Sequence, residues 1–213
     1  MFRSYGNPFR RMAAHRCLLR LLVAFFLLQH IGQVLFGSVF FRNYMVLSAS
    51  SLQDGHVWTL LSYALLHGSC LHLLVNGLTL HFIGRFIEQG LGPGHFLKIF
   101  LSSTLAGACF WLCLQPTATG SLIGASAGIA GLLAYACLCF PQHCASLLLF
   151  LVIPVRLRLR TLLGLLFAFE IGAFLLLELP GRDLIAHSAH LGGLIAGSGY
   201  FFCQEYIFRR TRR

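Results

Sequence analysis

Six long apolar stretches alternate with shorter, more polar connections along the chain. Each stretch is close to the length of about 20 residues that a helix needs to cross a bilayer. The pattern therefore predicts an all-α polytopic membrane protein, built as a bundle of six membrane-spanning helices. We place the spans near Cys17–Phe36, Cys70–Ile87, Phe96–Leu114, Leu122–Phe140, Leu162–Leu179 and Leu184–Phe202.

Two connections have patterns of their own. The first, from about Gly37 to Ser69, is long and mixes apolar and aromatic residues with serine, aspartate and histidine. We expect this outer loop to fold back into the membrane interface, with its apolar side chains against lipid or protein. On the inner side, the segment 146–153 is apolar but too short to span. Residues 155–160 then alternate between apolar and basic, which predicts an extended strip at the headgroup level.

The composition also indicates a membrane protein. Of the 213 residues, 57% are hydrophobic and 10% are charged, and the mean hydropathy is +0.78. The net charge of +10 raises the question of nucleic acid, but no basic patch interleaved with aromatics is present, so we expect no nucleic-acid partner. The eight cysteines show no paired C-x-x-C spacing, which indicates neither a zinc site nor a disulfide framework. We expect no metal, no cofactor, and the lipid bilayer as surroundings.

The basic residues predict the orientation. With the N-terminus in the cytoplasm, fourteen of the 16 Lys and Arg residues fall on the cytoplasmic side, and only Arg42 and Arg182 fall outside. Residues 1–16 then form a cytoplasmic segment, 17–203 the six-span membrane domain, and 204–213 a basic cytoplasmic tail. The first apolar run is too long for a signal peptide. Without a clear transit peptide, a bacterial inner membrane is favoured over an organelle.

Three predicted spans bring polar side chains to one depth. The second, fourth and sixth spans all run from outside to inside, so equal distances from their starts mean similar depths. At a rise of 1.5 Å per residue, Ser126, His190, His72 and Asn76 all lie within roughly 10 Å of the outer surface. His72 and Asn76 are four residues apart and project from one helix face. The topology thus predicts one shallow polar layer.

Small residues surround this layer: Gly124, Ala127 and Gly128 near the serine, and Gly192, Gly193 and Gly197 after the histidine. Such patterns let helices approach closely in lipid, as a serine needs in order to reach an imidazole on another helix. Taken singly, a serine bonded to its own helix or a packing glycine is an ordinary feature. We expect ordinary structural contacts for His30, His67, His81 and His187. The conjunction at one depth is what indicates a catalytic site.

These motifs resemble those of the rhomboid intramembrane serine proteases. Gly124-Ala125-Ser126 is similar to the GxSG-type nucleophile motif, and His190-Leu191-Gly192-Gly193 with Gly197 is similar to the catalytic-histidine helix. His67-Gly68, followed by His72-Leu73-Leu74-Val75-Asn76, is similar to the second-span HxxxN motif. Three motifs in the family's order, on the expected spans, make the resemblance specific.

The resemblance extends from about residue 58 to residue 200 and implies a Ser-His dyad without a third acidic residue. Ser126 would attack the scissile carbonyl, and His190 would take its proton and return it to the leaving amine. The backbone N–H of Ser126 with the side chains of His72 and Asn76 would form the oxyanion hole. Each donor would stabilise the transition state by about 3 kcal/mol. The implied activity is endopeptidase cleavage of other membrane proteins, in or near the outer end of their transmembrane segments.

Three positions depart from the family's pattern. Ala127 follows the serine where glycine is usual, and its methyl group would crowd the oxyanion site. Ala130, one turn further on, replaces an aromatic that commonly stacks on the catalytic histidine, so another group must orient His190. Trp58-Thr59 replaces a Trp-Arg pair of the first outer loop, which removes an anchor of that loop.

Two other functions stay open. A proteolytically silent rhomboid-like protein that binds membrane clients would keep the same fold, and the alanines at 127 and 130 favour it. A small transporter or haem carrier would use intramembrane histidines, but the sequence contains no visible inverted repeat.

The acidic residues suggest little by themselves. We expect Glu88 to form an ion pair with Arg85 and Asp183 to lie at the interface. Glu170 and Glu178 lie within or near the end of the fifth span, where a carboxylate needs a partner or water.

Overall fold

The computed structural model describes residues 13–37, 39–114, 120–149, 153–180 and 185–211. Each of the six predicted spans overlaps one of six main helices in this part of the chain. The long helices are α1 (Ala14–Phe36), α5 (Cys70–Leu91), α6 (Pro93–Leu114), α7 (Ser126–Cys139), α8 (Leu159–Ala173) and α9 (His187–Thr211). The short elements are α2 (Val39–Tyr44), α3 (Ala49–Gln53), α4 (Thr59–Ser62), η1 (Tyr63–Leu65), a π-helical turn η2 (Phe174–Glu178), β1 (Cys144–Leu149) and β2 (Ile153–Arg158).

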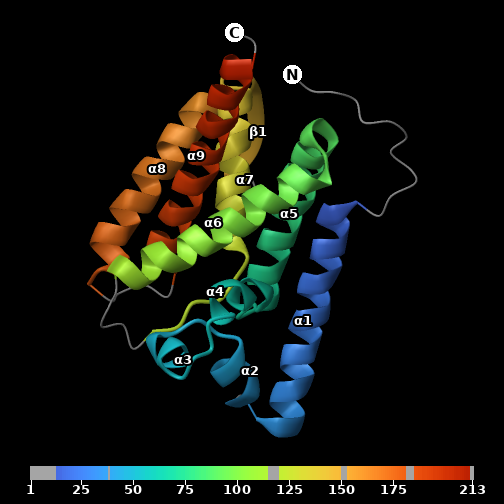
Figure 1. Ribbon diagram of the computed structural model, residues 1–213, viewed down its shortest axis with the longest axis vertical. Helices are drawn as coiled ribbons and strands as arrows, with labels where there is room; N and C mark the ends of the chain where they lie inside the picture. Colours follow the sequence, from blue (N-terminus) through green and yellow to red (C-terminus); the bar gives the residue numbers. More distant parts are fainter. Residues whose placement is uncertain (1–12, 38, 115–119, 150–152, 181–184, 212–213) are drawn as a thin grey trace.

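The long helices alternate in direction (Figure 1). The short helices α2, α3 and α4 lie at one end of the molecule, and β1 and the C-terminal end of α9 lie at the other. Helices α5, α7 and α9 therefore all start towards the end that carries the short helices. This is the relation between the second, fourth and sixth spans that the sequence predicts.

Within the described residues, four helical segments are long and apolar enough to cross a membrane: Ala14–Leu35, Cys70–Leu91, Pro93–Leu114 and Leu159–Glu178. Helix α7 is apolar but has only 14 residues. Helix α9 has 25 residues but is less apolar, because histidine, serine and glycine occur in its first half and glutamine, glutamate and arginine in its second. The protein is thus an all-α polytopic membrane protein, and the count of six spans stays a prediction.

Several predicted boundaries were wrong. The fourth helix begins at Ser126, not at Leu122, because the preceding residues form an irregular backbone segment. The fifth begins at Leu159 and runs through η2 to Glu178. The sixth continues to Thr211, beyond the predicted end of its span at Phe202. Its predicted start, Leu184, lies outside the described residues.

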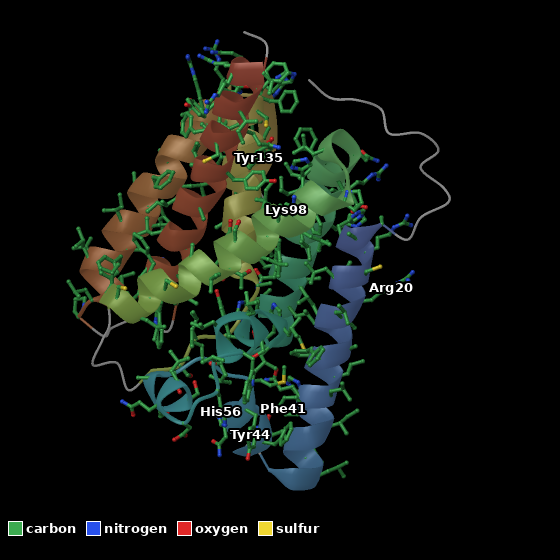
Figure 2. All side chains as sticks on the ribbon, in the orientation of Figure 1. Arg20, Phe41, Tyr44, His56, Lys98 and Tyr135 are labelled. Atoms are coloured by element: carbon green, nitrogen blue, oxygen red, sulfur yellow. The ribbon has the colours of Figure 1, made fainter. Side chains whose placement is uncertain are left out.

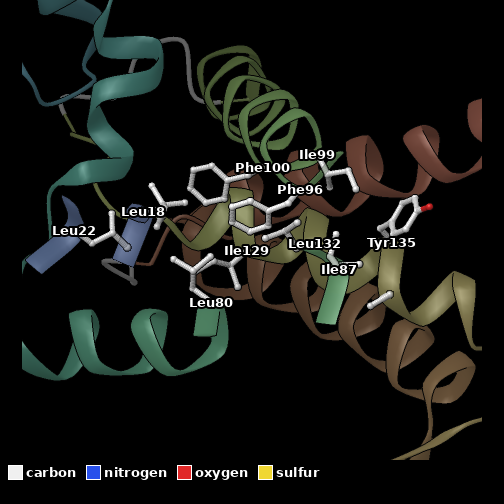
Figure 3. Packing of buried hydrophobic residues seen from close by; sticks show 12 residues of the cluster. Leu18, Leu22, Leu80, Ile87, Phe96, Ile99, Phe100, Ile129, Leu132 and Tyr135 are labelled. Atoms are coloured by element: carbon white, nitrogen blue, oxygen red, sulfur yellow. The ribbon is translucent and has the colours of Figure 1, made fainter. Parts of the chain in front are cut away.

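The core is formed where four helices meet (Figure 3). Its largest cluster combines side chains of α1, α5, α6 and α7. Among them Leu22, Leu80, Phe96, Ile99 and Leu132 are fully shielded from solvent. Burial of these side chains fixes the position of α7 between α5 and α6, and with it the position of Ser126.

Helices α7 and α9 approach each other closely through glycine. A Cβ at Gly193 would overlap the Ala127 carbonyl, and a Cβ at Gly197 would overlap the Gly131 carbonyl. Any larger residue would separate the two helices. The small residues predicted to permit close packing therefore do so at the contact that joins the serine helix to the histidine helix.

The first outer connection is folded rather than extended. Ser48 caps α3 by accepting a hydrogen bond from the Ser51 backbone, and the Trp58 indole donates to the Tyr44 carbonyl at 2.6 Å. Figure 2 shows Phe41, Tyr44 and His56 together at this end of the molecule. The loop is thus anchored without an arginine after Trp58. Its position at the membrane interface stays a prediction.

The opposite end carries a two-stranded antiparallel hairpin, in which β1 pairs with β2 from Cys144–Arg158 to Leu149–Ile153. The predicted extended strip is confirmed by β2 for residues 155–158, whereas Leu159 and Arg160 already belong to α8. The pairing strand β1 was not predicted, because its apolar sequence lacks alternation. Arg156 and Arg158 are exposed on the hairpin, as the period of two indicated.

Candidate active site

The segment before α7 is an irregular stretch held to the folded outer connection. The backbones of Leu47 and Leu122 bond to each other in both directions, at 3.3 and 2.8 Å. The Gly124 N–H donates to the Tyr63 carbonyl at 3.0 Å, and Gly124 has φ +114°, a backbone conformation that disfavours other residues. This turn ends the irregular stretch and starts α7 at Ser126.

Ser126 is therefore the first residue of its helix rather than a residue inside a span. The first backbone N–H groups of a helix have no acceptor within the helix, and the helix dipole is positive at this end. No side chain caps α7. Negative charge that develops beside Ser126 would thus meet free N–H donors.

His190 is the fourth residue of α9, and its Nε2 lies 2.8 Å from the Ser126 Oγ. This distance is a normal hydrogen bond between a hydroxyl and an imidazole nitrogen. The topology was predicted to bring Ser126 and His190 together, and the structure places their side chains in contact. The His190 side chain is 19% exposed, so the pair is largely but not completely shielded.

His72 and Asn76 lie beside the turn that precedes the serine. A Cβ on Gly124 would fall 2.8 Å from the His72 Nε2 and 3.8 Å from the Asn76 Nδ2. His72 is also near enough to His190 to interact with it electrostatically. The Asn76 Nδ2 is buried and has no hydrogen-bond partner among the described residues. An unused buried donor therefore lies next to the serine turn.

The methyl group of Ala127 does not have the position that the sequence suggested. It packs towards α6, 2.5 Å from where a Cβ of Gly107 would lie, in a buried cluster that includes Tyr63 and Trp111. Gly107 provides the space for it. The expected crowding of the oxyanion site is replaced by a packing contact with α6.

Two acidic side chains whose partners the sequence could not identify hold the start of α9. Glu170 of α8 contacts His187 Nδ1 at 2.6 Å and His190 Nδ1 at 3.1 Å, one carboxylate oxygen to each. Glu178 accepts from the Ser188 backbone N–H at 2.6 Å and from the Ser188 hydroxyl at 2.5 Å. The first turn of α9 is thus bonded to α8 and η2 at several points.

The π-helical turn explains why both glutamates face α9. Eight residues of regular α-helix rotate about 80° beyond two full turns, so Glu170 and Glu178 would lie on different faces. A π turn takes up extra residues and removes much of this excess rotation. The turn at Phe174–Glu178 therefore returns Glu178 to the face of Glu170.

The remaining histidines have different roles. His30 Nδ1 donates to the Phe26 carbonyl at 2.9 Å, which is the ordinary contact expected for it. His187 makes a contact of another kind: its Nδ1 lies 2.6 Å from one Glu170 oxygen, and the other Glu170 oxygen contacts His190. His187 and His190 are three residues apart on one helix face, a spacing that could have identified the pair.

His67 lies in the connection that leads into α5. Its backbone is clamped by the Gln29 side chain, with bonds of 3.2 Å at the carbonyl and 3.3 Å at the N–H. Its ring lies 4.9 Å from the ring of His72, centroid to centroid. Burial, with a smaller contribution from His72, lowers the pKa of His67 to about 4, so this imidazole is neutral at pH 7.

Glu88 does not form the expected pair with Arg85. It accepts bonds from the backbone N–H groups of Ala14 and His15, both at 2.9 Å, and so caps the start of α1.

One group of side chains in the described part of the chain could hold a metal ion. The ligand atoms of Glu170, His187 and His190 all lie within 4.8 Å of one another. These three side chains also bond to one another, since the Glu170 carboxylate contacts the Nδ1 atoms of both histidines, and this arrangement needs no metal.

Fold and site together define a class: a polytopic helical membrane protein in which a serine at a helix N-terminus bonds to a histidine of the neighbouring helix. Comparison with known proteins identifies the family. The sequence matches the Rhomboid domain over residues 54–205, which is more than half of the chain. The chain belongs to the rhomboid family.

Curated relatives come from bacteria, plants and an animal. RHOMBOID-like protein 12, mitochondrial, of Arabidopsis thaliana is 28% identical over 174 residues, covering 74% of this chain and 49% of that protein. Rhomboid protease GlpG of Pectobacterium atrosepticum is 32% identical over 155 residues, covering 72% and 51%. Rhomboid protease GluP of Bacillus subtilis is 29% identical over 149 residues, covering 70% and 26%. The chain thus spans about half of these relatives' length, or less.

Proposed function

We propose that the protein is an intramembrane serine endopeptidase that uses Ser126 and His190 as a catalytic dyad. The observation that carries this proposal is the 2.8 Å contact between His190 Nε2 and Ser126 Oγ. The chain is similar to proteins named as rhomboid proteases, which supports the same activity.

In this mechanism, His190 accepts the Ser126 proton as the hydroxyl oxygen attacks the scissile carbonyl. The resulting imidazolium then gives the proton to the leaving amine, and an acyl-enzyme remains on Ser126. Water, activated by the same histidine, hydrolyses the ester and restores the hydroxyl.

The oxyanion of each tetrahedral intermediate would be stabilised by the backbone N–H of Ser126 and the side chains of His72 and Asn76. The unpartnered Asn76 Nδ2 beside Gly124 supports this assignment, because a donor kept free in the resting enzyme costs no bond when the oxyanion forms. The start of α7 adds a favourable dipole.

The substrates would be transmembrane segments of other proteins, cut in or near their outer ends. A substrate helix must unwind before a peptide bond can enter the site, so glycine, serine or alanine near the cleavage point is expected. The start of α7 lies towards the end that carries α2, α3 and α4, opposite the basic hairpin, which supports a site that opens to the non-cytoplasmic side.

The membrane is proposed only in general terms. The protein is a multi-pass membrane protein, and the choice of a bacterial inner membrane rests on the sequence alone. Curated relatives named as mitochondrial and chloroplastic give organelle membranes equal weight.

The test compares wild type with Ser126→Ala and His190→Ala on a generic single-span substrate in reconstituted vesicles. The proposal predicts cleavage by wild type and none by either variant, with all three proteins folded. Folded wild type that binds the substrate without cutting it would instead support the client-binding alternative.

A further inference from the structure

We infer that Glu170 is a positioning residue for the catalytic histidine, so that the dyad acts as a serine–histidine–glutamate relay across three helices. This inference rests on the proposed protease function and deepens it. The chain of contacts runs from Ser126 Oγ to His190 Nε2 at 2.8 Å and from His190 Nδ1 to Glu170 Oε1 at 3.1 Å.

The two contacts of His190 require one tautomer. A general base must present a bare Nε2 to the serine hydroxyl, so the neutral ring carries its proton on Nδ1. That N–H points to a carboxylate oxygen, which can only accept when ionised. Glu170 therefore selects the tautomer that the reaction needs and fixes the plane of the ring.

The environment makes the charge of Glu170 useful during the reaction. When His190 takes the serine proton it becomes an imidazolium, and its side chain is only 19% exposed while that of Glu170 is 11% exposed. A positive charge in such a place is costly unless a negative group lies beside it. Glu170 supplies this group to His190 at hydrogen-bond distance.

Glu170 is itself held in place. Its second oxygen contacts His187 Nδ1 at 2.6 Å, and that imidazole is buried. One helical turn separates His187 from His190, so a single carboxylate bridges both rings. Glu178 fixes the same helix end through its two bonds to Ser188.

The test uses Glu170→Gln, with Glu178→Gln as the matched control, in the full chain reconstituted in vesicles. Both variants remove one buried carboxylate between the α8–η2 segment and α9. We expect Glu170→Gln to lower kcat by as much as about 10⁴-fold with little change in KM, by analogy with the neutralised aspartate of a serine triad. Glu178→Gln should lower the unfolding temperature and keep kcat within about threefold, because it leaves the His190 tautomer intact.

Two further variants separate positioning from folding. Glu170→Asp keeps the charge at shorter reach and should show a kcat between those of wild type and Glu170→Gln. In a His190→Ala background, Glu170→Gln should cause no further loss, since its effect passes through the imidazole. If Glu170→Gln does not fold, the inference is tested with Glu170→Asp alone. A lower kcat at a normal unfolding temperature supports the inference, and an unchanged kcat overturns it.

The outcomes distinguish this inference from the function on which it rests. Active wild type with an equally active Glu170→Gln, or equal loss of kcat in both glutamine variants, overturns the relay and leaves the protease intact. Wild type that never cleaves overturns both. A metal role is tested by dialysis against EDTA. Activity that is lost and then restored by Zn²⁺ assigns Glu170, His187 and His190 to a metal and overturns the relay. Activity that is unchanged by EDTA supports the relay.

Discussion

Replacing Asn76 by leucine tests the oxyanion hole, because it should change activity and stability in opposite directions. The Asn76 side chain is buried, and its Nδ2 has no hydrogen-bond partner among the described residues. Asn76→Leu removes this donor and keeps a side chain of similar size. In the transition state it removes one oxyanion donor, which costs about 3 kcal/mol, or roughly 100-fold in kcat. In the resting protein it removes an unsatisfied buried group that costs about 1–3 kcal/mol.

We therefore expect kcat to fall about 100-fold while the free energy of unfolding stays the same or rises. The assay combines cleavage of a single-span substrate with thermal unfolding in the same detergent. Ser103→Ala is the matched control, because the Ser103 Oγ is also buried and without a described partner, but faces Gly131 further along α7. This control should gain stability and keep its activity. A fully active Asn76→Leu, or one that is strongly destabilised, would refute the reasoning.

Further predictions concern glycine and histidine positions around the site. Gly193→Ala should separate α7 from α9, lower activity at least about tenfold and lower the free energy of unfolding by about 1–3 kcal/mol. Gly199 has open space around it, so Gly199→Ala should change neither quantity in the same cleavage and unfolding assays. Gly124→Ala should abolish cleavage, because its φ of +114° disfavours alanine and the new Cβ would lie 2.8 Å from the His72 ring; wild-type activity would contradict this. The unfolding temperature should fall as the pH drops from about 6.5 towards 4, because burial lowers the pKa of His67 to about 4 and the unfolded chain then binds the proton first. His67→Phe should weaken this dependence, and an unchanged slope would count against it.

The helical architecture and the meeting of Ser126 with His190 were predictable from the sequence for a physical reason. Apolar length defines membrane helices, alternation of direction defines depth, and glycine permits close approach. These three constraints act on whole segments, so errors of a few residues at the helix ends do not change which side chains meet.

The backbone before the serine was not predictable in the same way. Residues 122–125 are as apolar as a span, but their polar backbone groups bond to Leu47 and Tyr63 instead of continuing a helix. Hydropathy does not distinguish a continued helix from an irregular segment whose backbone bonds elsewhere, and the positive φ of Gly124 is visible only in three dimensions. As a result, the position of Ser126 at a helix N-terminus could not be foreseen.

The role of the acidic residues depends on rotations that sequence patterns do not define. Nothing in the apolar pattern of residues 159–178 determines which face of α8 meets α9, and a π turn shifts that face part-way along. The available signal was chemical: two intramembrane glutamates and a histidine pair three residues apart all require partners. Pairing them required the structure.

Labelling of the resting protein by a fluorophosphonate, followed by peptide mapping, tests the central claim most directly. A serine becomes reactive to this probe when a base activates it beside donors for the developing oxyanion. The account predicts a single adduct on Ser126 in folded wild type and none in folded His190→Ala. Folded wild type that is never labelled, or an adduct that persists in His190→Ala, would contradict it.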